Sequence, residues 1–193
     1  DAAHFANHAA GVVVAKLGTA SVSPAELMTA VSAAPTDVAK NVLPETRLVN
    51  VLNDLRAAGQ RIVMTNGCFD LIHPGHVRYL QQARALGDAL VVAVNDDDSV
   101  RRLKGKGRPV NTLDDRMAVL GALGAVDFVV SFAEDTPARL IEALAPDVLV
   151  KGGDYAVEQI AGHASVLARG GDVRVLDFVD GHSTSGLIER LND

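Results

Sequence analysis

The stretch from Arg61 to His76 constrains the fold of this chain more than any other part of the sequence. It begins with a short apolar run, turns at an Asn-Gly pair, and enters a helix at Pro74. Proline suits the first position of a helix, because its missing N–H would have no intrahelical partner there. A strand followed so closely by a helix places His73 and His76 at the mouth of the helix, just beyond the end of the strand. Free backbone N–H groups and the positive end of a helix dipole favour phosphate at such a place.

Apolar runs and helical patterns alternate along the rest of the chain. Strands are expected at residues 61–65, 89–94, 126–130, 148–150 and 173–176, and helices at 45–59, 74–86, 137–144 and from Asn95 and Thr112. This alternation predicts an α/β fold with a parallel sheet and helices on both of its faces. Ligands of such sheets bind beyond the carboxyl ends of the strands, where the polar motifs of this sequence lie.

Composition argues against several classes of protein. The net charge of −6 argues against general nucleic-acid binding, and the absence of Trp with only 4% aromatic residues argues against a base-stacking surface. No apolar run approaches the roughly 20 residues that a membrane span needs, and the first residues lack the pattern of a secretory signal. The single cysteine, Cys68, is expected to be a small buried residue and fits a reducing compartment, so we expect a cytoplasmic location.

The segment Gly67-Cys-Phe-Asp-Leu-Ile-His-Pro-Gly-His76 resembles the G-x-F-D-x-x-H-x-G-H motif of the cytidylyltransferase-like nucleotidyltransferases. The resemblance implies a Rossmann-like sheet and transfer of a nucleotidyl group from an NTP to a phosphorylated acceptor. Residues 61–191 look most like the adenylyltransferase domain of bifunctional heptose 7-phosphate kinase/heptose 1-phosphate adenylyltransferases. That resemblance implies ATP and a sugar phosphate as substrates, and it suggests a homodimer.

The N-terminal part resembles the last helices of a sugar kinase of the ribokinase type. A helix closed by Gly18 is followed by Ser23-Pro-Ala-Glu26, which has the spacing of a capping box. We therefore expect residues 1–44 to be a helical kinase remnant with a linker, and residues 45–193 to be the nucleotidyltransferase domain. The sites of the kinase would lie upstream, so no kinase activity is expected.

The two histidines of the motif match the phosphate-contacting histidines of the family. Imidazoles at a helix mouth can donate hydrogen bonds to phosphoryl oxygens that gain charge in the transition state. The alternative for His73 and His76 is a structural role, as a helix cap or a polar core residue. With Lys104 they form the expected catalytic set, His73, His76 and Lys104.

The main basic run of the chain spans Arg101 to Pro109. Glycines between its cations predict a mobile loop, whereas the alternative is a solvated charged face. Its L-K-G-x-x-R-P-V pattern resembles the substrate loop of the family, which implies a loop that closes over the bound nucleotide. Asp70 is expected either to orient the motif loop that contains it or to touch substrate. Asp115-Arg116 resembles a helix start of the family whose Arg can reach the acceptor phosphate, and the alternative is a surface salt bridge. The expected acceptor-binding residues are Asp70, Lys106, Arg108 and Arg116.

Two later segments resemble nucleotide-contacting segments of the family. Lys151-Gly-Gly-Asp154 resembles its K-G-x-D segment, and Gly181-His-Ser-Thr-Ser185 resembles a segment at a helix start whose hydroxyls hold the β- and γ-phosphates. A plain turn and an ordinary Ser/Thr cap are the respective alternatives. The expected nucleotide-binding residues are Gly67, Cys68, Phe69, Gly75, His76, Lys151, Gly152, Asp154, Ser183, Thr184 and Ser185.

No dedicated cage of metal ligands is expected. The acidic residues 96–98 are expected to cap a helix, with a metal role as the alternative, and Mg²⁺ would arrive with ATP, held largely by phosphate oxygens and water.

Three functions stay open at this point. The first is transfer of AMP from ATP to heptose 1-phosphate. The second is the same chemistry on glycerol phosphate, ethanolamine phosphate or a flavin phosphate, and the third is a non-catalytic nucleotide-binding module. Phe178-Val-Asp-Gly181 lacks the Arg of the R-T-E-G segment found in relatives that act on glycerol phosphate, which disfavours that acceptor.

Overall fold

The computed structural model describes residue 23 and residues 41–176. The chain divides into two compact units, Asp1–Asp37 and Val38–Asp193, and the fold below belongs to the second. The helices expected before residue 40 and the segment from Gly181 to Ser185 lie outside the described residues.

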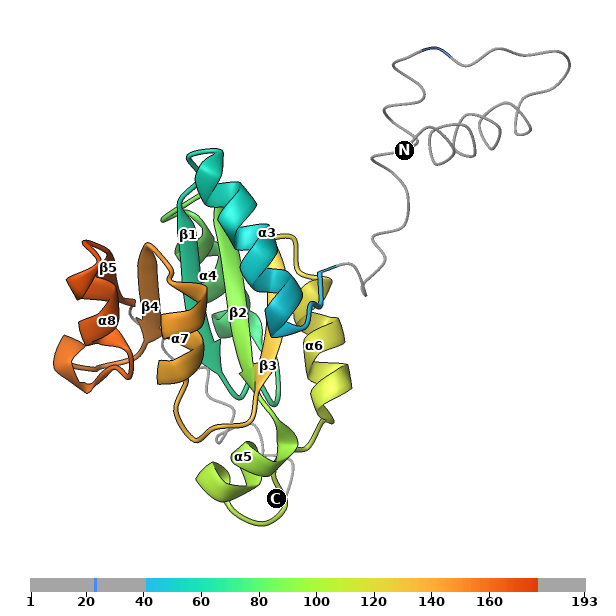
Figure 1. The fold of residues 1–193 in the computed structure, drawn as a ribbon. Helices are drawn as coiled ribbons and strands as arrows, with labels where there is room; N and C mark the ends of the chain where they lie inside the picture. Colours follow the sequence, from blue (N-terminus) through green and yellow to red (C-terminus); the bar gives the residue numbers. More distant parts are fainter. Residues whose placement is uncertain (1–22, 24–40, 177–193) are drawn as a thin grey trace, which may run out of the picture. The chain divides into compact units, whose positions relative to one another are not determined.

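Five parallel strands form one sheet in the order β3-β2-β1-β4-β5 (Figure 1). The order reverses at β1, which lies between β2 and β4, so the crevice at the carboxyl ends of β1 and β4 is the topological switch point where such sheets bind ligands. The strands are β1 (Ile62–Gly67), β2 (Ala89–Asn95), β3 (Phe128–Phe132), β4 (Val148–Gly152) and β5 (Asp172–Leu176). All seven residues of β2 are buried, as in a parallel sheet covered on both faces.

Helices cover both faces of the sheet. Leu48 and Leu52 pack in one core with Ile62 and Met64 of β1, whereas the alternate residue Val63 packs in the other core. The first face carries α3 (Glu45–Ala57), α7 (Ala138–Leu144), the 3₁₀ turn η2 (Val157–Gln159) and α8 (His163–Ala168), and the second carries α4 (Pro74–Arg84) and α6 (Leu113–Gly121) (Figure 1). This arrangement confirms the predicted Rossmann-like α/β fold.

A further helix, α5 (Asp97–Lys104), lies beyond the carboxyl ends of the strands (Figure 1). It corrects the prediction of a loop over the basic run, because the first part of that run is helical. Asp96 caps the helix by accepting a hydrogen bond from the Ser99 N–H at 2.7 Å, and Asp98 pairs with Arg101 one turn on. The helix ends at Gly105, whose φ of 90° favours glycine.

The segment ahead of α3 pairs with the edge of the sheet. Val42 forms a parallel bridge with Val129 of β3, and the Leu43 N–H donates to the Val129 carbonyl at 3.0 Å. In return the Val129 N–H donates to the Asn41 carbonyl at 2.8 Å, and Leu43 is buried. Residues 41–44, which the sequence assigned to a linker, are therefore part of the packed structure.

Candidate nucleotide site

The loop between β1 and α4 has a strained backbone at the switch point. Phe69 has a φ of 47°, in the left-handed region that a bulky residue seldom adopts, and such strain gathers at functional sites. A Cβ on Gly67 would lie 3.1 Å from the Phe69 ring, so glycine makes room for the ring of its own loop. The sequence analysis predicted Gly67 as a nucleotide-binding residue, whereas this contact is with its own loop.

The two histidines of this loop lie against each other. His73 precedes α4 in an extended conformation and its carbonyl accepts from the His76 N–H at 2.9 Å. The ring centroids of His73 and His76 are 3.9 Å apart, and the Phe69 ring is 5.6 Å from His76. Burial, and to a lesser extent the charge of His73, lowers the pKa of His76 to about 4. At neutral pH His76 is therefore an uncharged imidazole, and an anion bound beside it would raise its pKa.

A buried tyrosine joins α4 to both strands of the crevice. The Tyr79 hydroxyl lies 2.6 Å from Thr65 Oγ1 of β1 and donates to the Val150 carbonyl of β4 at 3.3 Å. Burial raises the pKa of Tyr79 to about 12, so the hydroxyl stays protonated. The helix that carries His76 is thus held to the strand ends by a side chain that the sequence did not single out.

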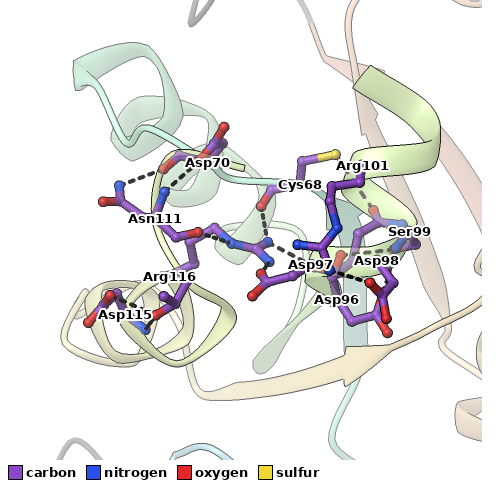
Figure 2. A network of polar contacts seen from close by, with 12 residues as sticks. Cys68, Asp70, Asp96, Asp97, Asp98, Ser99, Arg101, Asn111, Asp115 and Arg116 are labelled. Carbon is purple, nitrogen blue, oxygen red and sulfur yellow. Dashed lines mark hydrogen bonds and ion pairs between the residues drawn. The ribbon is translucent and has the colours of Figure 1, made fainter. Parts of the chain in front are cut away.

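Asp70 ties the motif loop to the segment that follows the basic run. Its carboxylate accepts from the backbone N–H groups of Val110 at 2.7 Å and Asn111 at 3.1 Å, and from Nε of Arg108. The Asn111 side chain returns a hydrogen bond to the Asp70 carbonyl at 2.8 Å (Figure 2). Asp70 is almost fully buried, and these bonds hold the motif loop against residues 108–111. Contact with an acceptor would require its carboxylate to exchange these partners.

Arg116 is buried, which corrects the alternative of a surface salt bridge. The residue is 1% exposed. Its guanidinium donates to the carbonyls of Cys68 at 2.6 Å, Asn95 at 2.8 Å and Asn111 at 3.2 Å, and to the Asp97 carboxylate at 2.7 Å (Figure 2). One side chain therefore fixes the motif loop, the end of β2, the start of α5 and the start of α6 against one another.

A lysine from β4 borders the same crevice. Lys151 belongs to the strand, which continues to Gly152, and Nζ lies 3.4 Å from the Asn66 carbonyl and 6.0 Å from the centre of the Tyr155 ring. Burial lowers the pKa of Lys151, and the nearby charge of Lys104 lowers it further. Among the described residues Lys151 is in no ion pair, so an anion in the crevice would stabilise its charge.

The other predicted site residues lie around the carboxyl ends of the strands. Lys104 and Lys106 are exposed, Arg108 is half-buried, and Lys104 is close enough for its charge to act on Cys68 and Lys151. Burial raises the pKa of Cys68 despite these cations, which makes it a poor nucleophile. Asp154 is exposed and follows Gly153, whose φ is 120°.

The family model described as "Cytidylyltransferase-like" matches residues 64–190, two thirds of the chain. The chain belongs to the cytidylyltransferase-like family. This confirms the expected enzyme class, a nucleotidyltransferase.

Relatives from several bacteria agree with the family. The chain is 62% identical over 187 residues to "Bifunctional protein HldE" of Alkalilimnicola ehrlichii, covering 97% of this chain and 39% of that protein. The proteins of the same name from Halorhodospira halophila and Methylococcus capsulatus are 62% and 60% identical over 99% and 100% of this chain, and it covers 40% and 41% of them. The chain thus spans about two fifths of the length of these relatives.

One solved structure supports the same fold. The crystal structure of "the lipopolysaccharide core biosynthesis protein" from Thermoplasma volcanium superposes with a TM-score of 0.52 at 28% sequence identity. The match covers 63% of this chain and 98% of that protein.

The carboxylates near the site of this cytidylyltransferase-like chain have protein partners. Asp96 caps α5, Asp97 pairs with Arg116, and Asp98 pairs with Arg101. Across residues 41–176 no three His, Cys, Asp or Glu side chains gather as a metal site would require. This donor set suits a Mg²⁺ ion that is held by a nucleotide rather than by the protein.

Within the described part of the chain, no helix is long and apolar enough to cross a bilayer.

Proposed function

We propose that the chain transfers AMP from ATP to D-glycero-D-manno-heptose 1-phosphate, giving ADP-heptose and pyrophosphate. The observation that carries the proposal is the paired imidazoles of His73 and His76 at the start of α4, in a crevice bordered by Lys151 and Lys104. Paired imidazole donors with cations beside them suit a polyphosphate whose α-phosphorus is under attack.

The substrates supply the reacting atoms. An oxygen of the sugar phosphate attacks the α-phosphorus and forms the new P–O bond, while the bond from the α-phosphorus to the α,β-bridging oxygen breaks. Pyrophosphate leaves with that electron pair. The protein needs no nucleophile of its own, which agrees with the poor reactivity of Cys68. Positioning and electrostatic stabilisation supply most of the rate in related phosphoryl chemistry.

Each part of the site has a proposed task. The histidines donate to the α-phosphoryl oxygens, and the backbone at Gly67, Cys68 and Phe69 borders the nucleotide. Lys151 and Lys104 neutralise phosphate charge. Arg108, held by Asp70, places the basic segment over the crevice. When bound, Mg²⁺ would come with ATP and reduce the repulsion between the two anionic substrates.

The choice of acceptor rests on the relatives. The proteins about 60% identical to this chain are called bifunctional, and the chain covers about 40% of them, as expected for one of two activities. The related Thermoplasma protein is described as one of lipopolysaccharide core biosynthesis, for which a heptose nucleotide is a fitting product. We assign the first 44 residues to the end of the preceding kinase part.

Pyrophosphate release from purified protein, Mg²⁺ and ATP or CTP tests this function against a panel of sugar and polyol phosphates. The proposal expects release with ATP plus heptose 1-phosphate and background release with CTP or glycerol 3-phosphate. Release with CTP and a polyol phosphate would keep the enzyme class and overturn the named reaction. No release with any pair, together with no ATP binding by calorimetry, would overturn catalysis at this site.

A further inference from the structure

A cavity lies at the amino ends of β1, β4 and β5, at the opposite end of these strands from the candidate nucleotide site. It has a volume of about 740 Å³ and is lined by the loops that precede these strands. Three arginines line it, Arg56 from α3, Arg61 just before β1, and Arg169 just before β5. Volumes of this order are usual for small-molecule sites.

These three arginines are among the described arginines that form no ion pair. Seven of the described arginines form ion pairs with carboxylates, as the structure shows for Arg84, Arg101, Arg102, Arg108, Arg116, Arg139 and Arg174. The five described arginines outside these pairs are Arg47, Arg56, Arg61, Arg78 and Arg169. Three of these five face one cavity in a protein whose net charge is −6.

One of the three is held rigidly. Arg56 donates through Nη2 to the carbonyls of Leu144 and Ala145, the latter at 3.1 Å, and through Nη1 to Asn53 at 2.9 Å. Its buried Nε has no hydrogen-bond partner among the described residues. Arg56 therefore donates to the terminal carbonyls of α7. Arg61 and Arg169 form no ion pair with a described carboxylate.

The other groups around the cavity leave it open and cationic. Asp147 is the carboxylate among the lining residues, and its Oδ2 already accepts from the Ile62 N–H at 2.7 Å. Asp88, beside the rim, accepts from the Arg61 backbone N–H at 2.8 Å. Gly59 and Gly170 have φ of 78° and 80°, and the space where a side chain would begin is empty at both.

We propose that this cavity is an anion site for a small molecule that carries a phosphoryl or diphosphoryl group. Guanidinium groups match phosphate oxygens with paired donors, and an arginine without a carboxylate partner supplies that match at no cost of breaking an ion pair. The ligand sits at the opposite end of β1 and β4 from the candidate nucleotide site. The proposal is independent of the proposed reaction.

Nuclear magnetic resonance of ¹⁵N-labelled protein titrated with inorganic pyrophosphate tests this site. The amide signals of Gly59, Gly170 and Gly171 report on the cavity, whereas those of Gly67 and Gly152 report on the nucleotide site. We expect saturable shifts of the cavity signals. Arg61→Gln and Arg169→Gln should each weaken that binding about tenfold or more, the usual loss when a hydrogen-bonded charge is removed, and leave the response of Gly67 and Gly152 unchanged.

The matched control is Arg47→Gln, which removes an exposed arginine of α3 that does not line the cavity. It should leave the titration unchanged. Cavity signals that fail to saturate, or that respond equally in Arg47→Gln and Arg61→Gln, would overturn the site and leave the arginines as cations that stabilise helix ends. Saturation by a polyglutamate peptide but not by pyrophosphate would overturn the small-molecule class.

Discussion

At the scale of single residues, the site depends on polar groups held away from water. His76 is uncharged at neutral pH because of burial. Burial lowers the pKa of Lys151, which has no ion-pair partner among the described residues, and Arg116 is buried with four acceptors. The histidines and Lys151 were predictable because their residue types stand in a known motif. The burial of Arg116 was not predictable. Most of its acceptors are backbone carbonyls, which every residue type carries and which a sequence therefore does not reveal.

The first prediction concerns the titration of His76. Its pKa should be about 4 in the free protein, below the ordinary 6.5, because burial disfavours the charged ring. Between pH 6.5 and 4 the unfolded chain takes up a proton that folded His76 does not, so this residue lowers stability as the pH falls through that window. Imidazole NMR signals followed against pH measure the pKa directly. In His73→Ala the pKa of His76 should rise part of the way towards 6.5, and a value of 6.5 in the unsubstituted protein would contradict the burial argument.

The second prediction concerns catalysis by the same residue. His76→Ala should lower kcat about 100-fold or more, the usual loss when a transition-state donor is removed, while the circular dichroism spectrum stays unchanged. His163→Ala is the control, since the His163 ring bonds its own turn at the Ile160 carbonyl and should be dispensable. A folded His76→Ala enzyme with undiminished kcat would remove His76 from the mechanism.

The third prediction concerns the buried arginine. Arg116→Met should lower the free energy of unfolding by about 3–5 kcal/mol, because it leaves Asp97 and three carbonyls without their donor. Arg102→Met removes an exposed pair with Asp135 and should cost about 1 kcal/mol or less. Urea denaturation of both variants makes the comparison. Equal losses would show that Arg116 does not organise the site.

At the scale of elements, the site is built from α4, α5 and the segment that Asp70 holds. The sequence correctly predicted the helix at Pro74 and the strands on either side of the crevice. It placed the basic run in a loop because glycines follow Lys104, whereas the cap at Asp96 and the Asp98–Arg101 pair extend the helix through that lysine. The helix extends or ends according to local contacts such as the cap and the ion pair. The spacing of residues in the sequence does not show whether these contacts outweigh the following glycines.

The fourth prediction concerns the tie between Asp70 and the basic segment. Asp70→Ala removes the acceptor of Val110, Asn111 and Arg108. The change should lower stability by about 1–3 kcal/mol and speed tryptic cleavage after Lys104 and Lys106. Asp98→Ala, which breaks an exposed pair on α5, is the control and should leave the cleavage rate unchanged. Equal cleavage of the two variants would argue against an anchored segment.

At the scale of the whole molecule, the parallel sheet and its switch point follow from the alternation of strands and helices, which the sequence shows clearly. Pairing of residues 41–44 with β3 was not predictable, because the segment is short and ends at Pro44, so its sequence resembles that of a linker. The arginine-lined cavity was also missed. Arg169 lies more than a hundred residues after Arg56 and Arg61 in the sequence. Only the order of the strands in the sheet brings the three together.

The fifth prediction concerns the start of the folded domain. A chain that begins at Glu45 loses two hydrogen bonds to Val129 and the buried Leu43, so it should be less stable by about 2 kcal/mol than one that begins at Val38. Thermal unfolding compares the two, and pyrophosphate release should persist in the longer one. Equal melting temperatures would show that residues 41–44 add nothing to the fold.

The most direct test of the central claim is ³¹P NMR of the reaction of ATP with heptose 1-phosphate whose phosphate carries ¹⁸O. Attack by the sugar phosphate on the α-phosphorus predicts ADP-heptose with ¹⁸O in the bridge between its two phosphorus atoms, together with unlabelled pyrophosphate. Unlabelled bridging oxygen, or formation of ADP or orthophosphate in place of pyrophosphate, would contradict nucleotidyl transfer at this site.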